Sequence, residues 1–430
     1  MIKVTKYPQL DQIASLLQRP AQNIETLMGS VKEVVNAVRE NGDEAVKKYT
    51  QQFDHTTLTD LAVSQREIDD AAQQISPELK DAIAVAAKNI RTFHEAQKQT
   101  EQRIETMAGV TCWRKSVAIE RVGLYIPGGT APLFSTVLML GIPAVIAGCK
   151  HIVLCSPPDK NGKINPAILY AAQHIGLRKI YKTGGIQAIA AMTFGTQTIP
   201  RVDKIFGPGN AFVTAAKQYV SQLGVAIDMP AGPSEVMILA DDSCVPAFVA
   251  ADLLSQAEHG ADSQVVLVTQ SENVATLVNA ALEQQLQQLQ RKDIAEKSLA
   301  HSKILLVHNC AEMIEIANVY APEHLIIATQ NADAMAEQIV NAGSVFIGNY
   351  SPESAGDYAS GTNHALPTAG YARTHSGVSV DSFMKKITFQ KLTQQGLSNL
   401  SATIVNMADT EGLQAHSNAV KLRIENEEQG

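Results

Sequence analysis

Apolar residues recur at helical spacing through the first hundred positions of the chain. Residues 31–38, 43–49, 67–75 and 77–92 carry Ala, Val, Ile and Leu at helical intervals, and Asn41-Gly42 and Ser76-Pro77 interrupt the pattern. We therefore predict a helical start to the chain. No group of residues in this part suggests chemistry.

From Gly109 onward, short apolar segments alternate with longer amphipathic ones. The pattern predicts strands at 110–120, 122–126, 151–155, 179–182 and 204–206, and helices at 166–174, 187–194 and 210–221. After residues 230–234 the alternation restarts, with strands predicted at 235–240, 264–269, 304–307, 325–328 and 344–347. Strands that alternate with helices indicate parallel sheets with helices on both faces, so we predict two such sheets. Beyond Asp381 we expect helices again, followed by a charged tail at 423–430.

Composition indicates an ordinary folded protein and excludes several classes. The chain has 430 residues, of which 45% are hydrophobic and 18% charged, which is enough for two or three domains. Acidic residues outnumber basic ones by 43 to 35, so nucleic acid and anionic membranes are poor partners. The longest apolar runs, such as 136–147, are too short to span a bilayer, and the first residues carry no signal core. Five cysteines without a Cys-x-x-Cys pair predict reduced thiols and a cytoplasmic location.

A short stretch that ends at Gly260 carries the first candidate for chemistry. Apolar residues through 247–254 predict the last turns of a helix, with Asp242 or Ser243 as its cap and Gly260 as a left-handed terminator. Gln256 and His259 are close enough in sequence to share one face of that helix end. An amide oxygen and an imidazole on one face supply half of a metal site, although such residues are more often solvated.

Three Gly-rich turns, at 127–129, 184–185 and 207–210, follow predicted strands and open predicted helices. In parallel sheets, ligands bind beyond the carboxyl ends of the strands, where the backbone amides of a helix start favour phosphate oxygens. A nucleotide is therefore a candidate ligand, but the full Gly-x-Gly-x-x-Gly pattern and its acidic ribose partner are missing. Turns that only shorten loops stay an equal alternative.

Two polar clusters lie in the last third of the chain. Glu323 and His324 stand side by side ahead of a predicted strand, so one could activate water while the other carries a proton. Residues 351–364 are dense in small and polar side chains and include Asp357, a hard oxygen ligand. One candidate set offers two nitrogens and two oxygens, which zinc accepts: Gln256, His259, Asp357 and His416. Spacing alone does not show that these four meet.

Several long motifs resemble those of histidinol dehydrogenase. They are Asp-Met-Pro-Ala-Gly-Pro-Ser-Glu at 228–235, Leu-Leu-Ser-Gln-Ala-Glu-His-Gly at 253–260, Pro-Glu-His-Leu at 322–325 and Ser-Ala-Gly-Asp-Tyr at 354–358, together with residues 123–129 and 206–210. The resemblance covers essentially the whole chain, and no motif position departs from the pattern. That family oxidises L-histidinol to L-histidine, the last step of histidine biosynthesis, by two hydride transfers to NAD through a bound aldehyde.

The resemblance also implies roles for individual residues. Glu323 and His324 would perform acid–base catalysis, and zinc would be held by Gln256, His259, Asp357 and His416. Residues in contact with NAD would be Tyr125, Gln187 and Asn210. Ser234, His364 and Glu411 would contact the substrate, together with His324 and the zinc ligands. Because the family is homodimeric and its carboxyl-terminal tail reaches the partner, Glu411 and His416 would complete the other subunit's site.

With the resemblance, we predict an α/β fold of two Rossmann-like parallel-sheet domains, with a helical N-terminal segment and an extended C-terminal dimerisation tail. One domain would be discontinuous, formed by residues 22–120 with 234–375, and the other would span 121–233. Residues 1–21 with 376–430 would form the tail region. Two other functions stay open from the residues alone: a zinc-dependent hydrolase in which Glu323 activates water, and a non-catalytic metal- and nucleotide-binding scaffold. The Gly-rich turns argue against the hydrolase.

Overall fold

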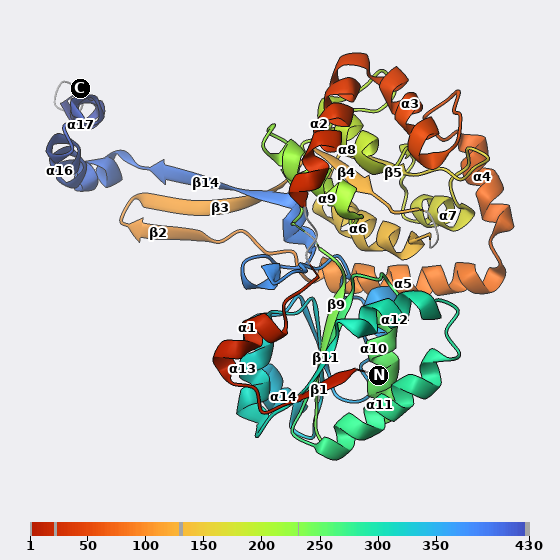
Figure 1. The fold of residues 1–430 in the computed structure, drawn as a ribbon. Helices are drawn as coiled ribbons and strands as arrows, with labels where there is room; N and C mark the ends of the chain where they lie inside the picture. The colour runs from red at the N-terminus through yellow and green to blue at the C-terminus, as the bar shows by residue number, and fades with distance from the viewer. Residues whose placement is uncertain (1, 21–23, 129–131, 231, 426–430) are drawn as a thin grey trace. The chain divides into compact units, whose positions relative to one another are not determined.

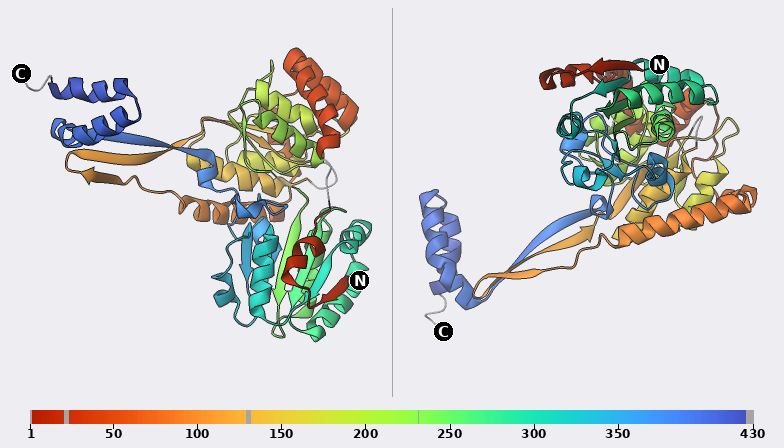
Figure 2. Two further views of the ribbon diagram at one scale, coloured as in Figure 1. Left: turned by 60° about the vertical axis from the view of Figure 1, so that its left-hand side comes forward. Right: turned by 90° about the horizontal axis from the view of Figure 1, so that it is seen from below.

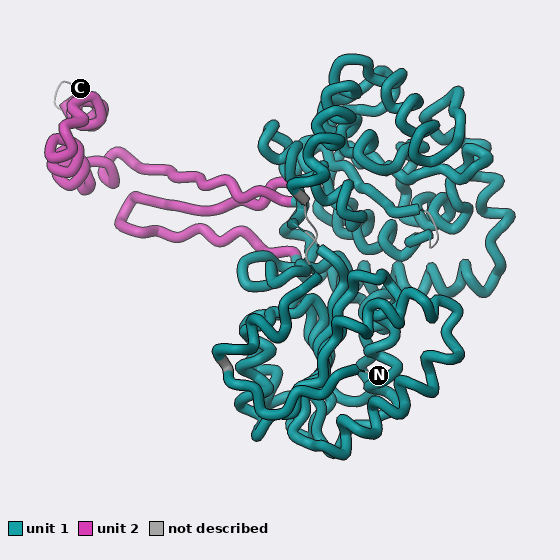
Figure 3. The backbone as a smooth tube through the Cα atoms, viewed as in Figure 1, with its two compact units in different colours: residues 1–97, 119–383 teal, residues 98–118, 384–430 magenta. Residues whose placement is uncertain are grey.

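The computed structural model describes residues 2–20, 24–128, 132–230 and 232–425. These residues form two compact units, one of residues 1–97 and 119–383 and one of residues 98–118 and 384–430 (Figure 3). The predictions for Gly129, Ala231 and the end of the charged tail lie outside the described residues.

In the first unit, the strands of residues 121–227 form one parallel sheet with the order β6-β5-β4-β7-β8 (Figure 1). The strands are β4 (Arg121–Tyr125), β5 (His151–Ser156), β6 (Ile180–Lys182), β7 (Lys204–Phe206) and β8 (Ala226–Ile227). Every pairing is parallel. Counted from β4, the order is 3-2-1-4-5, as at the start of the doubly wound nucleotide-binding fold. We call this the five-stranded sheet.

A second parallel sheet in the same unit has the order β1-β11-β10-β9-β12-β13, and we call it the six-stranded sheet. Its strands are β1 (Lys3–Lys6), β9 (Glu235–Ala240), β10 (Gln264–Thr269), β11 (Lys303–Leu306), β12 (His324–Ala328) and β13 (Ser344–Ile347). Counted from β9, it repeats the 3-2-1-4-5 order and adds β1 at the edge. The prediction of two parallel sheets is confirmed. The pattern missed β1, because a strand this short with Lys at both ends carries little periodicity.

Helices cover both faces of the five-stranded sheet (Figure 1). On one face, α8 (Gly185–Phe194) and α9 (Ala211–Ser221) share a buried core with the strands, and α2 (Ile24–Asn41) and α3 (Asp43–Asp54) pack outside them. On the other face lie α6 (Phe134–Ala147) and α7 (Pro166–His174), against which α5 (Pro77–Glu95) and α4 (Gln65–Gln74) pack. The helices α2 to α5 therefore pack around the five-stranded sheet. From the sequence we predict instead that residues 22–120 form one domain with residues 234–375. The division of the chain into domains stays a prediction.

The six-stranded sheet has two separate cores because its side chains alternate between faces. One core contains α10 (Pro246–Ala257), α11 (Glu272–Leu286) and α12 (Lys292–Ala300), and the other contains α1 (Ile13–Leu16), α13 (Cys310–Tyr320) and α14 (Ala332–Ala336). A short helix α15 (Glu353–Tyr358) follows β13, and 3-10 turns lie at Leu10–Gln12, Tyr371–Arg373 and Val380–Phe383. No helix among the described residues is both long and apolar enough to cross a membrane.

The second unit is a three-stranded antiparallel sheet with a pair of helices. In it, β3 (Val110–Ala118) lies between β2 (Arg103–Met107) and β14 (Met384–Leu392), and α16 (Gln394–Thr410) packs against α17 (Gln414–Glu425) (Figure 2). The expectation of helices directly beyond Asp381 was therefore wrong for β14. Phe389 of β14 stacks on Trp113 of β3 with ring centroids 5.2 Å apart, and local periodicity cannot reveal a pairing between such distant positions.

We predict that Gly207→Ala lowers the free energy of unfolding by about 3 kcal/mol. Gly207 has a φ of +131°, and a Cβ there would lie 2.1 Å from the carbonyl oxygen of Tyr125. Gly224→Ala is the matched control, because its φ is +93° but nothing lies within 4 Å of its Cβ position. Backbone strain alone should cost about 1 kcal/mol there. Urea unfolding followed by circular dichroism measures both, and equal losses would contradict the close approach at Gly207.

Candidate functional site

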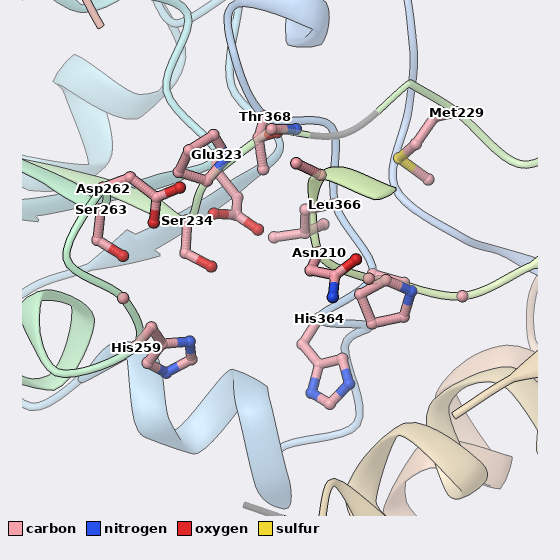
Figure 4. Close-up of a pocket in the computed structure, with 18 of the residues that line it drawn as sticks. Asn210, Met229, Ser234, His259, Asp262, Ser263, Glu323, His364, Leu366 and Thr368 are labelled. Carbon is pink, nitrogen blue, oxygen red and sulfur yellow. The ribbon is translucent and has the colours of Figure 1, made fainter. Parts of the chain in front are cut away.

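A cavity of about 540 Å³ opens between the two parallel sheets of the first unit. Its walls come from the turn at 207–210, from residues 228–229 and 232–234, from the segment that follows α10, from Glu323 just before β12, and from residues 364–366 and 368. Predicted site residues from both sheets line it: Asn210, Ser234, His259, Glu323 and His364 (Figure 4). The fold therefore brings together residues that the sequence scatters over more than a hundred positions.

The cavity lies at the carboxyl edge of the five-stranded sheet and at the amino edge of the six-stranded sheet. The turn at 207–210 follows β7 and lies at the carboxyl edge of the five-stranded sheet. Glu235 and His324 begin β9 and β12, so they lie at the amino edge of the six-stranded sheet. Since β8 leads directly into β9, residues 228–234 cross from one edge to the other. The expectation that ligands lie beyond the carboxyl ends of strands holds for the five-stranded sheet and not for the six-stranded one.

Glu323 and His324 are buried against the backbone of Glu235, the first residue of β9. The Glu235 N–H donates to Oε2 of Glu323 at 2.9 Å, and Nδ1 of His324 lies 3.3 Å from the Glu235 carbonyl oxygen. With Nδ1–H donating to that carbonyl, Nε2 carries the free lone pair. This Nε2 is buried and has no hydrogen-bond partner among the described residues. When the imidazole is neutral, a proton would be accepted at Nε2.

Three side chains meet where a metal ion could bind. One ligand atom from each of His259, Glu353 and Asp357 lies within 4.8 Å of the other two. Glu353 and Asp357 are one turn apart on α15, so they share a face. The Oδ1 of Asp357 is also 3.6 Å from Nε2 of His324. The structure thus brings the predicted ligands His259 and Asp357 together and adds Glu353, which our sequence reasoning missed.

Gln256 lies fully buried beside this cluster, with its amide between Glu353 and Glu235. In one orientation its nitrogen donates to the Glu353 carboxylate, and its oxygen accepts the Glu235 N–H at 3.0 Å. The imidazole of His259 and the carboxylates of Glu353 and Asp357 are nitrogen and oxygen donors, a set that fits a divalent metal ion.

Burial changes the proton affinity of the groups around the cluster. It raises the pKa of Glu353 to about 8, although the His324 ring opposes this, and it raises the pKa of Glu323 above the usual range in the same way. Burial alone would lower the pKa of His324, but the nearby Glu353 and Glu323 carboxylates outweigh it and raise that pKa. The carboxyl groups of Glu323, Glu353 and Asp357 thus surround the His324 imidazole. A bound cation would lower the pKa of each of these carboxyls.

The residues assigned to NAD lie around the Gly-rich turns of the five-stranded sheet. Asn210 lines the cavity and caps α9 by accepting the Val213 N–H at 3.1 Å. The Tyr125 hydroxyl accepts the Gly185 N–H at 3.3 Å. Gln187 is buried, with its Nε2 3.4 Å from a carboxylate oxygen of Asp54. Of the three residues, only Asn210 is part of the described lining of this cavity.

Two of these glycine turns are also required by packing. A Cβ on Gly128 or on Gly184 would lie 2.6 Å from a side-chain carbon of Pro157. Pro157 therefore fills the space that a side chain at either position would need. The close approach of both turns to Pro157 is enough to explain why glycine stands at these two positions. It does not depend on whether a phosphate binds there.

His364 and Ser234 lie on opposite sides of the cavity (Figure 4). His364 is held at both ring nitrogens, by the Asp357 carbonyl oxygen at 2.9 Å and the Thr136 hydroxyl at 3.0 Å. Ser234 is half-buried and immediately precedes β9. Both side chains are placed where a ligand in the cavity would meet them, and their substrate roles stay predictions.

Glu411 and His416 lie in the second unit, and both are exposed. Glu411 is the C-cap of α16, and His416 lies in the first turn of α17. Among the described residues, the group of His, Cys, Asp and Glu side chains close enough to hold a metal contains neither. The predicted fourth zinc ligand therefore stays a prediction.

The helix before this site differs from the prediction at both ends. It ends at Ala257, Glu258 is right-handed, and Gly260 does not adopt a positive φ. His259 instead follows the helix in a turn, with its N–H 3.2 Å from the Gln256 carbonyl oxygen. Neither Asp242 nor Ser243 caps the start, because the N-cap is Val245 and Asp242 accepts from the Ser271 hydroxyl. Those predictions were wrong, although Gln256 and His259 still point into one site.

The chain is similar over its length to histidinol dehydrogenases. The family model for histidinol dehydrogenase matches residues 17–424. The histidinol dehydrogenase of Bacteroides fragilis is 60% identical over 424 residues, which are 99% of each chain, and that of Escherichia coli (strain K12) is 53% identical over 417 residues, which are 96% of this chain and 95% of the other. The crystal structure of histidinol dehydrogenase from Elizabethkingia anophelis matches with a TM-score of 0.97 at 55% identity, covering 99% of this chain and 98% of that one.

We predict that Glu353→Gln weakens zinc binding by roughly tenfold to a hundredfold, because it removes a charge from the cluster and a partner of the Gln256 amide. Titration calorimetry of zinc into metal-free protein measures the affinity. Glu283→Gln on α11 is the matched control, since that side chain is exposed. Equal zinc affinities in the two variants would remove Glu353 from the metal site.

Proposed function

The chain belongs to the histidinol dehydrogenase family, and on that premise we propose how its residues carry out the reaction. Its function is that of an NAD-dependent oxidoreductase in the last step of histidine biosynthesis. We infer that L-histidinol is oxidised twice, through bound L-histidinal, with the reduction of two NAD. The observation that carries the mechanism is the buried pair of Glu323 and His324, both bound to the backbone of Glu235 at the edge of the cavity.

One zinc ion would be held by Gln256, His259 and Asp357, with the partner subunit's His416 as the fourth ligand. The proximity of His259, Glu353 and Asp357 supports this, with the Gln256 amide beside Glu353. When bound, the ion would anchor the imidazole and amine of histidinol and fix the alcohol carbon in place. In this arrangement Glu353 would orient the Gln256 amide.

His324 would act as the base in both oxidations. Its unpartnered Nε2 would take the alcohol proton as the hydride leaves the carbon for NAD, and later the proton of the hydrated aldehyde. Glu323 would remove a proton from the water that adds to the aldehyde between the two oxidations. The backbone of Glu235 would keep the two groups from exchanging roles, because its N–H binds the Glu323 carboxylate and its carbonyl faces the His324 ring.

NAD would bind along the carboxyl edge of the five-stranded sheet, in contact with Tyr125, Gln187 and Asn210. The Rossmann-like 3-2-1-4-5 strand order supports this, because such sheets bind nucleotides at that edge. Asn210 opens α9 at the cavity wall, so the positive end of that helix would face a phosphate group.

We propose that the extended tail of the second unit forms a homodimer. Its described residues expose large apolar side chains, including Ile104, Met407 and Leu422 at 59%, 62% and 59%. An antiparallel sheet and a helix pair of this size cannot bury such surface alone. A cytoplasmic location is part of the proposal and is supported by five free cysteines.

One assay distinguishes the dehydrogenase from the two alternative functions, a zinc-dependent hydrolase and a non-catalytic metal- and nucleotide-binding scaffold. With zinc, NAD and L-histidinol present, the dehydrogenase forms two NADH per histidinol consumed. A scaffold binds without turnover, and a hydrolase forms no NADH.

We predict that Glu323→Gln keeps the first oxidation near its normal rate and slows the second by about a hundredfold or more. Gln has the shape of Glu and its oxygen can still accept the Glu235 N–H, but it cannot take a proton from water. Rapid-quench analysis of histidinol and histidinal oxidation measures the two steps separately. Equal loss in both steps would contradict this division of roles.

A mixing experiment tests the shared site. The His416→Ala variant and the Glu323→Gln variant are each expected to be slow alone. In a dimer with one subunit of each variant, one of the two sites has every residue intact. Random subunit exchange should therefore restore about a quarter of the normal activity. Absence of rescue, with mixed dimers verified by native mass spectrometry, would place His416 in its own subunit's site.

A further inference from the structure

A buried ion pair lies behind Glu323 and His324 and has no role in the mechanism above. The Nε of Arg19 donates to Oε2 of Glu235 at 2.7 Å, and the Glu235 side chain is only 2% exposed. The other Glu235 oxygen, Oε1, accepts the N–H of Ala369. Because both oxygens of this carboxylate have donors, the side chain is held in one position.

Arg19 is itself held by Tyr320, the last residue of α13. Its Nη2 donates to the Tyr320 carbonyl oxygen at 2.9 Å, and its guanidinium lies 3.9 Å from the centre of the Tyr320 ring. The Tyr320 hydroxyl donates to Gln264 at 2.8 Å, and Gln264 donates to the Gln18 carbonyl oxygen at 3.2 Å. The planar guanidinium can serve two acceptors and stack on a ring at once, which a Lys ammonium cannot.

The residue that Arg19 holds is the one that orients the catalytic pair. The Glu235 N–H binds the Glu323 carboxylate, and the Glu235 carbonyl faces Nδ1 of His324. Movement of the Glu235 side chain would therefore move both groups. No hydrogen bond between described residues joins Arg19 directly to Glu323 or His324.

We propose that Arg19, acting through Glu235, is a positioning residue for Glu323 and His324. The inference rests on the proposed function of that pair. The ion pair fixes Glu235 at the start of β9. The N–H of Glu235 sets the direction of the Glu323 carboxylate, and its carbonyl sets the plane and tautomer of the His324 ring. A misplacement of about 1 Å at reacting groups can slow a reaction by roughly a hundredfold.

The expected signature is a loss of kcat without a change in KM. Arg19→Ala should lower kcat by about a hundredfold. Arg19→Lys should lower it by about tenfold, because Lys keeps the charge but lacks the planar guanidinium that binds two acceptors at once. The KM for histidinol and for NAD should change by about twofold at most, since Arg19 is placed behind the groups that bind them. The zinc content should stay at one ion per chain.

Arg19→Ala leaves the Glu235 carboxylate buried without its cation, which can unfold a protein. The double variant Arg19→Met with Glu235→Gln removes both charges and keeps side chains of similar size, so it should fold and show a similar loss of kcat. Arg121→Ala is the control, because it breaks an exposed Arg–carboxylate pair with Asp203, with bonds of 2.7 and 3.1 Å. It should leave kcat unchanged.

A double-mutant cycle with Glu323→Gln decides whether Arg19 acts through the catalytic pair. In the Glu323→Gln background, Arg19→Ala should lower kcat by about tenfold or less, because the group it positions is already impaired. Losses that multiply independently would overturn the inference, and so would normal kcat in a folded Arg19→Ala protein or a rise in KM alone. If Glu323→Gln by itself leaves both oxidations unchanged, the proposed function fails, whatever the Arg19 variants show.

Discussion

The parallel pairing of β12 with β9 is the constraint on which the site depends. His324 pairs with Val236, so Glu235 lies one position before this ladder begins. Its N–H and carbonyl are therefore available to Glu323 and His324 instead of to β12. A slip of one residue would move Glu323 and His324 each to the opposite face of the sheet and break their contacts with Glu235.

The segment between β8 and β9 joins the carboxyl edge of the five-stranded sheet to the amino edge of the six-stranded sheet, and its described residues 228–229 and 232–234 line the cavity. A buried pair of Lys217 and Asp228 holds the start of this segment. Lys217 donates to the Gly207 carbonyl oxygen at 2.8 Å, and Asp228 accepts the Gly207 N–H at 2.8 Å. The connection and the Gly-rich turn beside Asn210 are thus fixed to each other, which defines the distance across the cavity.

Periodicity predicted the two parallel sheets well, because their strands are short apolar runs between amphipathic helices. It failed for β1 and β14, whose pairing depends on residues far away in the chain. At the site, Gln256 and His259 were found from local spacing, and Glu353 could have been, since it lies one helical turn before Asp357 in a segment already singled out as polar. Arg19 has no local signal: only the folded chain places it beside Glu235.

We propose that one metal ion joins side chains from two copies of the chain beside Glu323 and His324. Diffraction at the zinc absorption edge, from crystals grown with zinc and L-histidinol, tests this proposal most directly. We expect one anomalous peak within bonding distance of Gln256, His259, Asp357 and the partner subunit's His416, with the alcohol carbon of histidinol near Nε2 of His324. A peak bonded to Glu353 in place of His416, or no peak at this position, would contradict it.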